Sequence, residues 1–395
     1  MVGDDLPIGR RVAHWRVRRR LTQQMLADRL GKSKSWVDKV ERGVRALDKF
    51  SVIRDIAEVL RVDPSALTGE DIASVATADA VDGVDGIRAA LAQYDVLWAG
   101  SGDRPALPAG ELDRRVGHAW LSYEHADYPR LVRMLPGLLG DAQRSQAADD
   151  GDETTALLVQ SYRITASVLV KLGEPELAWL AADRAMAVSC GDRQLTAVAA
   201  IPLGQALRAS GRGRLAMAVT IAAARRVTPA APPDLSLCGA LLVEAALAAA
   251  TCGDAQSTEE LIDQAAKIAG RVGDSRDHHR TSFGPATVEV ARVTAAVALG
   301  DGGTAVTWHE KAVSGSGWKL LPAEHRAAHL VDAAQAYLHV GDLLRAGRAL
   351  VDADRTAPAE VRLRPAARTV IAHVMRGGPA PAGVANLAAL VGLTR

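Results

Sequence analysis

The sequence predicts an all-α protein, with a small basic unit of five short helices at the N-terminus and a long array of helices behind it. The hydrophobic residues, 48% of the chain, are mostly Ala, Leu and Val, and few β-branched runs are bounded by Gly or Pro, so helices are favoured almost everywhere. Residues 1–45 carry a formal charge of +7 and the remaining 350 residues carry −6. Glycine also returns between apolar helices at spacings of 38 to 47 residues.

At 395 residues the chain is too long for one compact core, so at least two folding units are expected. It has no run of about 18 uncharged apolar residues, and Asp4 and Asp5 precede any apolar stretch. We therefore expect a soluble, cytoplasmic protein without a membrane span. A basic unit followed by an acidic one is typical of a nucleic-acid module fused to a different functional domain.

The basic unit is predicted to contain helices over 8–19, 22–30, 33–42 and 48–60, and a short fifth helix after Asp63-Pro64. Thr22 and Ser33 are suitable N-caps for the second and third helices. Gly31 can take the left-handed conformation of the tight turn between these two helices, and Gly43 ends the third. This spacing is typical of a helix-turn-helix.

The segment resembles the Cro/repressor-type (XRE) helix-turn-helix family over about 60 residues. Arg20 departs from the family pattern, which often has glycine there, so the first helix is expected to run slightly longer. The matching residues are Leu21-Thr22-Gln23, Leu26-Ala27, Leu30-Gly31, Ser33, Val37, Val40-Glu41-Arg42-Gly43, Arg45, Ile56-Ala57 and Leu60.

The resemblance implies that the third helix enters the major groove of double-stranded DNA. Lys34, Ser35 and Lys39 would meet base edges, which gives a mild expectation of guanine in the half-site. Trp36 would lie near a phosphate or a thymine methyl, and the other residues would hold the backbone. The full set of implied DNA-binding residues is Arg10, Gln23, Ser33, Lys34, Ser35, Trp36, Lys39, Arg42 and Arg45. Whether Arg16, Arg18, Arg19 and Arg20 add phosphate contacts or form a solvated charged face stays open.

Behind this domain (1–69), residues 69–86 are small, acidic and poorly patterned, which predicts a hinge or linker. A helix over 87–98 and a Gly/Pro loop over 99–110 follow, so that 70–110 forms a connecting segment. The third segment, 111–395, holds a repeat. Its turn glycines are Gly173, Gly211, Gly253, Gly300 and Gly341. Alanine stands twelve residues after each turn glycine. Small residues occupy most of the positions five residues after and seven residues before these glycines.

This register resembles the tetratricopeptide repeat (TPR) over about 111–358, with repeats longer than usual and a degenerate early copy within 118–142. Small residues let the two helices of a repeat pack closely and stack on the next pair. Final helices over about 360–375 and 384–391 would cap a TPR-like α-solenoid. The three segments together give a predicted lambda-repressor-like five-helix domain followed by this solenoid.

The TPR resemblance implies that the first helix of each repeat lines a concave groove, basic and polar at one end and apolar in the middle. Arg163, Lys171 and Arg208 could receive a carboxylate or a phosphate, although such side chains are often only solvated. The ligand-binding residues expected are Gln160, Arg163, Lys171, Gln205, Arg208, Leu247, Gln335 and His339. The same offsets place Arg114, Glu124, His125, Ser167, Ile201, Val243, Val290, Thr294, Val297, Val331 and Leu338 on this face.

An XRE domain joined to a TPR body is similar to the peptide-pheromone quorum regulators of Gram-positive bacteria. Those regulators typically hold the peptide backbone with groove asparagines, whereas the one asparagine of this chain is Asn386. A peptide, a small metabolite and a protein partner therefore stay open as effectors.

Neither a catalytic constellation nor a phosphate-binding glycine loop is recognisable, so no enzyme activity and no cofactor are predicted. His278-His279 is read as part of a solvated loop rather than a metal site. The first hypothesis is a homodimeric, ligand-gated regulator that binds a pseudo-palindromic operator. The alternative is a TPR interaction scaffold whose helix-turn-helix does not read DNA sequence.

Overall fold

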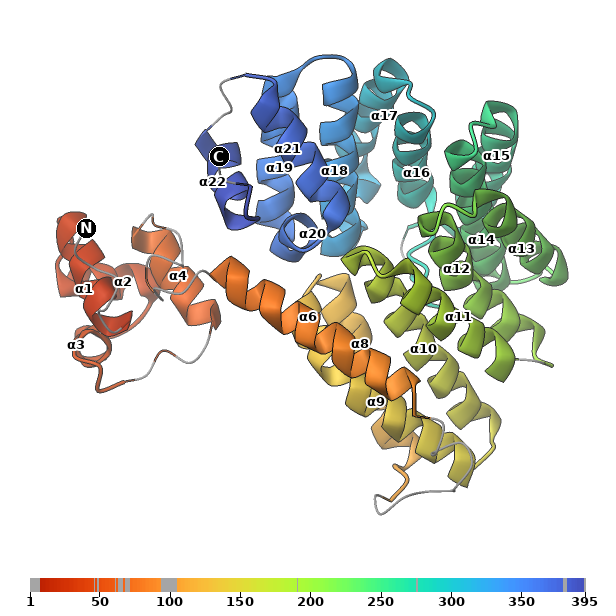
Figure 1. Ribbon diagram of the computed structural model, residues 1–395, viewed down its shortest axis with the longest axis horizontal. Helices are drawn as coiled ribbons and strands as arrows, with labels where there is room; N and C mark the ends of the chain where they lie inside the picture. The colour runs from red at the N-terminus through yellow and green to blue at the C-terminus, as the bar shows by residue number, and fades with distance from the viewer. Residues whose placement is uncertain are drawn as a thin grey trace. The chain divides into compact units, whose positions relative to one another are not determined.

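The computed structural model describes residues 8–45, 47, 50–60, 62, 67, 72–93, 105–189, 191–274, 276–378 and 382–393. Every regular element in these residues is a helix, which confirms the all-α class (Figure 1). The chain divides into two compact units, which we call the N-terminal unit (Met1–Ala78) and the helical body (Asp79–Arg395). The finer predicted boundaries around residues 69 and 110 stay predictions.

Four helices of the N-terminal unit agree with the predicted ones to within two residues. The predicted fifth helix lies, apart from Leu67, outside the described residues. Val12, Leu26, Val37 and Ile56 are at most 1% exposed and form a single core. The four helices are α1 (Ile8–Arg18), α2 (Gln23–Leu30), α3 (Lys34–Glu41) and α4 (Phe50–Leu60).

Arg20 takes the place of the family glycine without lengthening the first helix, contrary to the expectation. Helix α1 ends at Arg18, and Arg20 has a φ of +55°. Its amide donates to the carbonyl of Val17 at 2.8 Å, which closes the turn. Arginine therefore adopts the left-handed conformation that glycine adopts at lower cost.

The segment predicted as a hinge or linker, 69–86, is helical from Ile72 onward, and the division between the two units falls within it. Helix α6 (Ile72–Leu91) replaces both this linker and the start of the helix expected over 87–98. Its glycines serve close packing: a Cβ on Gly83 would lie 2.4 Å from Cγ2 of Val132 in α9 (Tyr128–Ala148). Ile87 and Leu91 on the same helix are fully buried.

The body is a series of antiparallel helix pairs, as the TPR resemblance implied (Figure 1). The early copy expected within 118–142 is the first of them, and its turn uses Ala126 at a φ of +54° instead of a glycine. The pairs are α8 (Ala109–Glu124) with α9, α10 (Asp152–Leu172) with α11 (Pro175–Val188), α12 (Arg193–Ala209) with α13 (Gly213–Arg226), α14 (Pro232–Thr251) with α15 (Ala255–Val272), α16 (Pro285–Ala298) with α17 (Gly302–Ser314), and α18 (Ala323–His339) with α19 (Leu343–Thr356). A short 3₁₀ helix, η1 (Ser316–Leu320), precedes α18.

The glycine register marks the turn of each later pair. All five turn glycines have φ between +74° and +80°, a region that side chains with a Cβ rarely adopt. The alanines twelve residues after them are at most 5% exposed, and they allow the two helices to approach each other. These alanines are Ala185, Ala223, Ala265, Ala312 and Ala353.

The array closes on itself within the body, since α18 packs against α8 (Figure 1). Ala327 of α18 and Ala357 after α19 are buried in the same hydrophobic core as the first helix pairs. A Cβ on Gly173 would lie 2.7 Å from Cγ of Pro365. The first helices of the pairs therefore face a common inner side of the body.

The helix expected over 360–375 is two helices. They are α20 (Pro358–Arg362) and α21 (Pro365–Arg376), and α22 (Ala382–Leu390) follows. Pro365 has no amide hydrogen to continue the ladder of α20, so a new helix starts at this residue.

One helix of the described residues, α14, is long and apolar enough by composition to cross a membrane. In the body, 78% of its most apolar stretch is buried. It packs against α13 and α15, which is the place of a core helix.

The close approach of α1 and α3 gives a first prediction. A Cβ on Gly9 would lie 2.1 Å from the carbonyl oxygen of Val40, a backbone atom that cannot rotate away. We expect Gly9→Ala to destabilise the N-terminal unit by about 1–3 kcal/mol, the usual cost of overpacking. Native-state hydrogen exchange of the α1–α3 amides in the full chain measures this loss.

The matched control is Gly303→Ala on α17, where the nearest atom is 3.8 Å from the added Cβ. This substitution should leave stability unchanged or slightly raised. Equal exchange rates in wild type and Gly9→Ala would contradict the packing of α1 on α3.

Candidate functional site

Helix α3 of the N-terminal unit has one buried and one exposed face. Val37 and Val40 are each 1% exposed and pack into the core. Lys34, Ser35 and Lys39 lie on the exposed side, as the sequence predicted. Neither lysine forms an ion pair with a residue that the structure describes, so α3 presents two uncompensated cations to solvent.

The first turns of α2 and α3 are capped as predicted. Thr22 Oγ1 accepts from the amide of Met25 at 3.1 Å, and Ser33 Oγ accepts from the amide of Trp36 at 3.1 Å. Both hydroxyl hydrogens stay available to donate. Ser33 can therefore cap α3 and donate to a phosphate at the same time.

The other predicted DNA contacts surround α3. Arg10 is exposed on α1. Arg42 Nη2 lies 2.5 Å from Asp38 Oδ2 in an exposed pair, and the guanidinium of Arg45 lies 5.9 Å from the ring of Trp36. An exposed pair of this kind is worth at most about 1 kcal/mol, so the Arg42–Asp38 pair can open to bind a phosphate.

A buried carboxylate joins three helices of the unit. Glu41 is 5% exposed and receives Arg16 through Nε at 2.6 Å and Nη2 at 3.0 Å. Gln23 Nε2 donates to the same carboxylate at 2.8 Å. Arg16 therefore forms a structural ion pair with Glu41 and is neither a solvated nor a phosphate-binding residue. The side-chain amide of Gln23, which was predicted to meet a phosphate, already donates to Glu41.

The inner face of the helical body holds a cavity of about 270 Å³. The first helices of all six pairs line it, together with the loop before α16. The predicted groove residues that line it are Arg163, Ser167, Lys171, Ile201, Gln205, Arg208, Val243, Leu247, Val290 and Thr294. These residues belong to α10, α12, α14 and α16, so the family offsets agree with the inner face over the second to fifth pairs, whereas Arg114, Glu124 and His125, expected there from α8, do not line this cavity.

Two predicted ligand residues lie elsewhere. Gln335 and His339 line a separate cavity with Thr369, Val370 and His373 of α21. Because the array closes, α21 covers this end of α18 and divides the expected groove. Gln160 does not line the main cavity either: its Oε1 accepts from Trp120 Nε1 at 3.1 Å and from Arg163 at 2.8 Å.

The predicted basic end of the groove is balanced by carboxylates that the sequence did not indicate. Arg208 Nη2 lies 3.4 Å from Glu244 Oε2, and Gln205 donates to the other oxygen of Glu244 at 2.8 Å. Lys171 forms ion pairs with Glu324 and Glu360. The expectation that Lys171 and Arg208 stand ready for an anion is therefore wrong.

Lys171 belongs to a cluster that ties the last helices to the first, which we call the clasp. Glu360 is fully buried and accepts from Lys171 at 2.9 Å, from Arg364 at 3.1 Å and from the hydroxyl of Tyr128. Burial alone would raise the pKa of Glu324, but Lys171 holds it well below its usual value. The carboxylate of Glu324 is therefore held in its charged form by Lys171.

Arg163 is the exception to this charge balance. It is 2% exposed, and its Nη1 donates to Gln160 Oε1 at 2.8 Å and to the carbonyl of His279 at 3.1 Å. Burial lowers its pKa to about 9, and Asp277 offsets this only in part. No carboxylate of the described residues lies within ion-pair distance of it.

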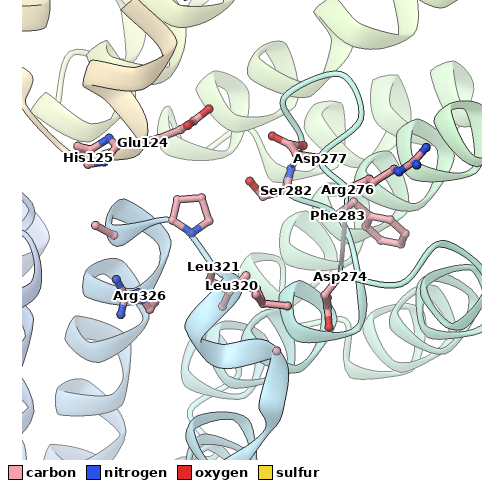
Figure 2. A pocket seen from close by; sticks show the side chains of 13 residues that line it. Glu124, His125, Asp274, Arg276, Asp277, Ser282, Phe283, Leu320, Leu321 and Arg326 are labelled. Atoms are coloured by element: carbon pink, nitrogen blue, oxygen red, sulfur yellow. Dashed lines mark hydrogen bonds between the residues drawn. The ribbon is translucent and has the colours of Figure 1, made fainter. Parts of the chain in front are cut away.

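The loop before α16 spans the mouth of the inner face and forms one wall of a second cavity of about 420 Å³. Figure 2 shows Asp277 and Ser282 of this loop across the cavity from Glu124 and His125 at the end of α8. Arg280 Nη1 lies 3.1 Å from Glu124 Oε1 and bridges the two sides. His279, predicted in a solvated loop, uses its carbonyl to bind Arg163.

Residues 7–68 match the protein family described as the helix-turn-helix domain. The match spans α1 to α4, with the capped α2, the left-handed Gly31 and the exposed face of α3. The N-terminal unit carries a helix-turn-helix domain. The predicted organisation, a helix-turn-helix domain followed by a TPR-like body of helix pairs, is confirmed.

The chain is also similar to Bacillus thuringiensis PlcR, in a crystal structure in complex with the peptide PapR7 and DNA. The similarity covers 78% of this chain and 93% of that one, with 12% sequence identity and a TM-score of 0.37. At this TM-score the likeness carries no argument about function. No curated protein matches the sequence significantly.

Glu41 is the residue of the helix-turn-helix domain whose role sequence reasoning missed. It matched the family pattern, but no function was assigned to it. A signal was present, because Glu41 stands four residues after Val37 and shares its buried side of α3. An acidic residue on a buried helix face needs a cation, and Arg16 supplies it.

A buried histidine pair beside the cavity gives a pH prediction. His309 Nδ1 and His329 Nε2 lie 2.9 Å apart, and burial, with a smaller effect of His309, lowers the pKa of His329 to about 3. The unfolded chain binds a proton near pH 6.5 and the folded chain does not, so stability falls as the pH drops below 6.5. At pH 5 the loss is about 2 kcal/mol relative to pH 7.

The variant His329→Gln should therefore show a flatter dependence of thermal stability on pH between 7 and 5, measured on the full chain by calorimetry. His118→Gln, an exposed substitution on α8, is the matched control and should keep the wild-type slope. The clasp acts in the opposite direction: burial lowers the pKa of His325, but Glu324 raises it above its usual value overall. Its contribution is lost as the pH rises above 6.5. An unchanged slope in His329→Gln would refute the pair's role.

Proposed function

We propose that the protein is a sequence-specific DNA-binding transcription regulator whose helical body binds a small effector that changes DNA affinity. The observation that supports DNA binding is the exposed face of α3. Lys34 and Lys39 stand there without an ion-pair partner among the described residues, on the helix that enters the major groove in helix-turn-helix domains. Ser35 lies on the same face.

The packing of the domain supports this use of α3. The Glu41 carboxylate holds α1, α2 and α3 together through Arg16 and Gln23, so the lysines project from a rigid support. Arg10, Arg42 and Arg45 would contact flanking phosphates, and Trp36 a phosphate or a thymine methyl. Gln23 would contribute through its carbonyl or through the α2 amides, because Glu41 already binds its amino group.

The cavity on the inner face of the body supports the binding of an effector. It combines an apolar wall with charged side chains, which is the composition of small-molecule sites. We also propose a cytoplasmic homodimer on a pseudo-palindromic operator, since one domain of this size reads only about 3–5 base pairs. Two copies double the interface and the specificity.

DNA binding by the full chain tests the proposal. A duplex selected from a random library by the wild-type protein should bind the variant Lys34→Ala with Lys39→Ala about 30-fold more weakly or worse. This factor corresponds to about 1 kcal/mol for each lost contact. Wild-type affinity should also fall steeply as salt rises, because bound phosphates release counterions.

The control Lys267→Ala with Lys319→Ala removes the same charge from exposed positions of the body and should keep wild-type affinity. If selection enriches no sequence, or if both double variants lose affinity equally, the chain does not read DNA through α3. The alternative of an interaction scaffold then takes its place.

A further inference from the structure

Arg163 lines the cavity of the body, its guanidinium 5.2 Å from the ring of Trp120, and the Nε–Nη2 edge of this group has no acceptor among the described residues. Its Nη1 is occupied by Gln160 and by the His279 carbonyl. Nε is fully buried without a hydrogen-bond partner, and no described residue accepts from Nη2. A buried cationic group with two unused donors is expensive unless something else completes it.

The Nε–Nη2 edge has the geometry that a carboxylate prefers. Nε and Nη2 of one arginine form two parallel hydrogen bonds to the two oxygens of a carboxylate. The chain itself uses this edge twice: Arg16 binds Glu41 through it at 2.6 and 3.0 Å, and Arg362 binds Asp354 at 2.8 and 3.0 Å. Arg163 offers the same edge with no carboxylate of its own.

The surrounding charges limit the ligand to a single negative charge. Lys171, Arg208, Arg280 and Arg364 already have carboxylate partners. Asp332 lines the same cavity, forms no ion pair with a described residue, and repels a more highly charged anion. A monocarboxylate balances Arg163, whereas a phosphate dianion brings surplus charge into a site of low polarity.

An apolar wall lies in the same cavity. Ile201, Val243, Leu247 and Val290 line it from α12, α14 and α16. The volume of about 270 Å³ is at the small end of ligand sites. These features fit a compact molecule with an apolar tail.

The loop of residues 276–284 covers this region. His279, Arg280 and Ser282 have φ of +56°, +55° and +49°, which is unusual for residues other than glycine. Contacts at several points hold the loop in this form: the Arg163–His279 bond, the Arg280–Glu124 pair and a 2.9 Å contact between Thr281 Oγ1 and Ser236 Oγ. Such backbone strain persists only where the surroundings impose it, so a ligand that replaces the Arg163–His279 bond would remove one of the contacts that hold the loop in this form.

We propose that Arg163 anchors a subsite for a small monocarboxylate with an apolar tail, and that the 276–284 loop covers this subsite and shifts when the carboxylate binds. This inference rests on the proposed effector-binding function and gives the chemical class of the effector.

Straight-chain carboxylates from acetate to octanoate are the probes, with calorimetry on the full-length protein. Octanoate should bind, and affinity should grow by about three- to fourfold per methylene. Octanol, which lacks the charge, and inorganic phosphate should bind at least tenfold more weakly. Hydrogen exchange of the 276–284 amides should change on adding octanoate.

Arg163→Met should weaken octanoate binding at least tenfold. Arg214→Met removes an arginine from an exposed position on α13 and should bind octanoate as the wild type does. Equal octanoate binding by Arg163→Met and wild type would overturn the subsite. Absence of binding for the whole carboxylate series, or a preference for phosphate, would overturn it as well.

A measurement without any ligand separates a binding role from a structural one. If Arg163 is an uncompensated buried cation kept for a ligand, Arg163→Met should raise the melting temperature of the unliganded protein. If Arg163 serves only to hold the loop, the same variant should melt at a lower temperature, and the proposal fails.

The regulator hypothesis fails separately. The Lys34→Ala with Lys39→Ala variant should lose DNA affinity and bind octanoate unchanged. Octanoate binding that leaves the DNA affinity of the wild type unaltered would end the proposed regulation, while the Arg163 subsite would stand.

Discussion

The buried carboxylate of Glu360 is the interaction on which the closed form of the body depends. It accepts from Lys171 on α10, from Arg364 at the N-cap of α21 and from Tyr128 on α9, and so joins helices from both ends of the array. A carboxylate without solvent exposure is tolerated only when it is fully paired, and loss of one partner of such a cluster typically costs about 3–5 kcal/mol. Any slip of α20 along α9 and α10 would leave a charge unpaired, so the cluster selects one register of closure.

The N-terminal unit uses the same physical device on a smaller scale. Glu41 is the buried carboxylate there, and Arg16 and Gln23 bring α1 and α2 to α3. In both units a charge at the meeting point of several helices fixes their geometry, while the apolar contacts supply most of the stability. Arg163 contrasts with these two sites, because no carboxylate of the described residues pairs with its buried charge.

The features that could be predicted from the sequence are those that local physics decides. Thr22 and Ser33 cap helices, and Gly31 and Gly173 take left-handed turns, because no distant residue is needed for either effect. Helix periodicity and the small-residue register located the pairs of the body. The repeat offsets then placed ten groove residues on the inner face, which follows from the fixed geometry of a helix pair.

The features that the sequence missed depend on contacts between distant segments. The small, acidic residues 69–86 predicted a hinge or linker, but most of them are helical, and Gly83 and Gly86 allow α6 to lie close against α9. We predicted that Lys171 receives an anion, because its partner Glu360 stands 189 residues later in the chain and no local pattern joins the two. Gln335 and His339 do not lie in the predicted groove, because α21 packs over them. No local sequence pattern predicts this packing.

Closure of the array has a consequence for how such a protein can change in length. In an open solenoid each repeat touches only its neighbours, so the chain tolerates the gain or loss of a repeat. Here the circumference is set, because α8 must meet α18 while Lys171 reaches Glu360. Deleting or duplicating one helix pair would separate these partners and expose the interior. The body therefore folds with a fixed number of helix pairs.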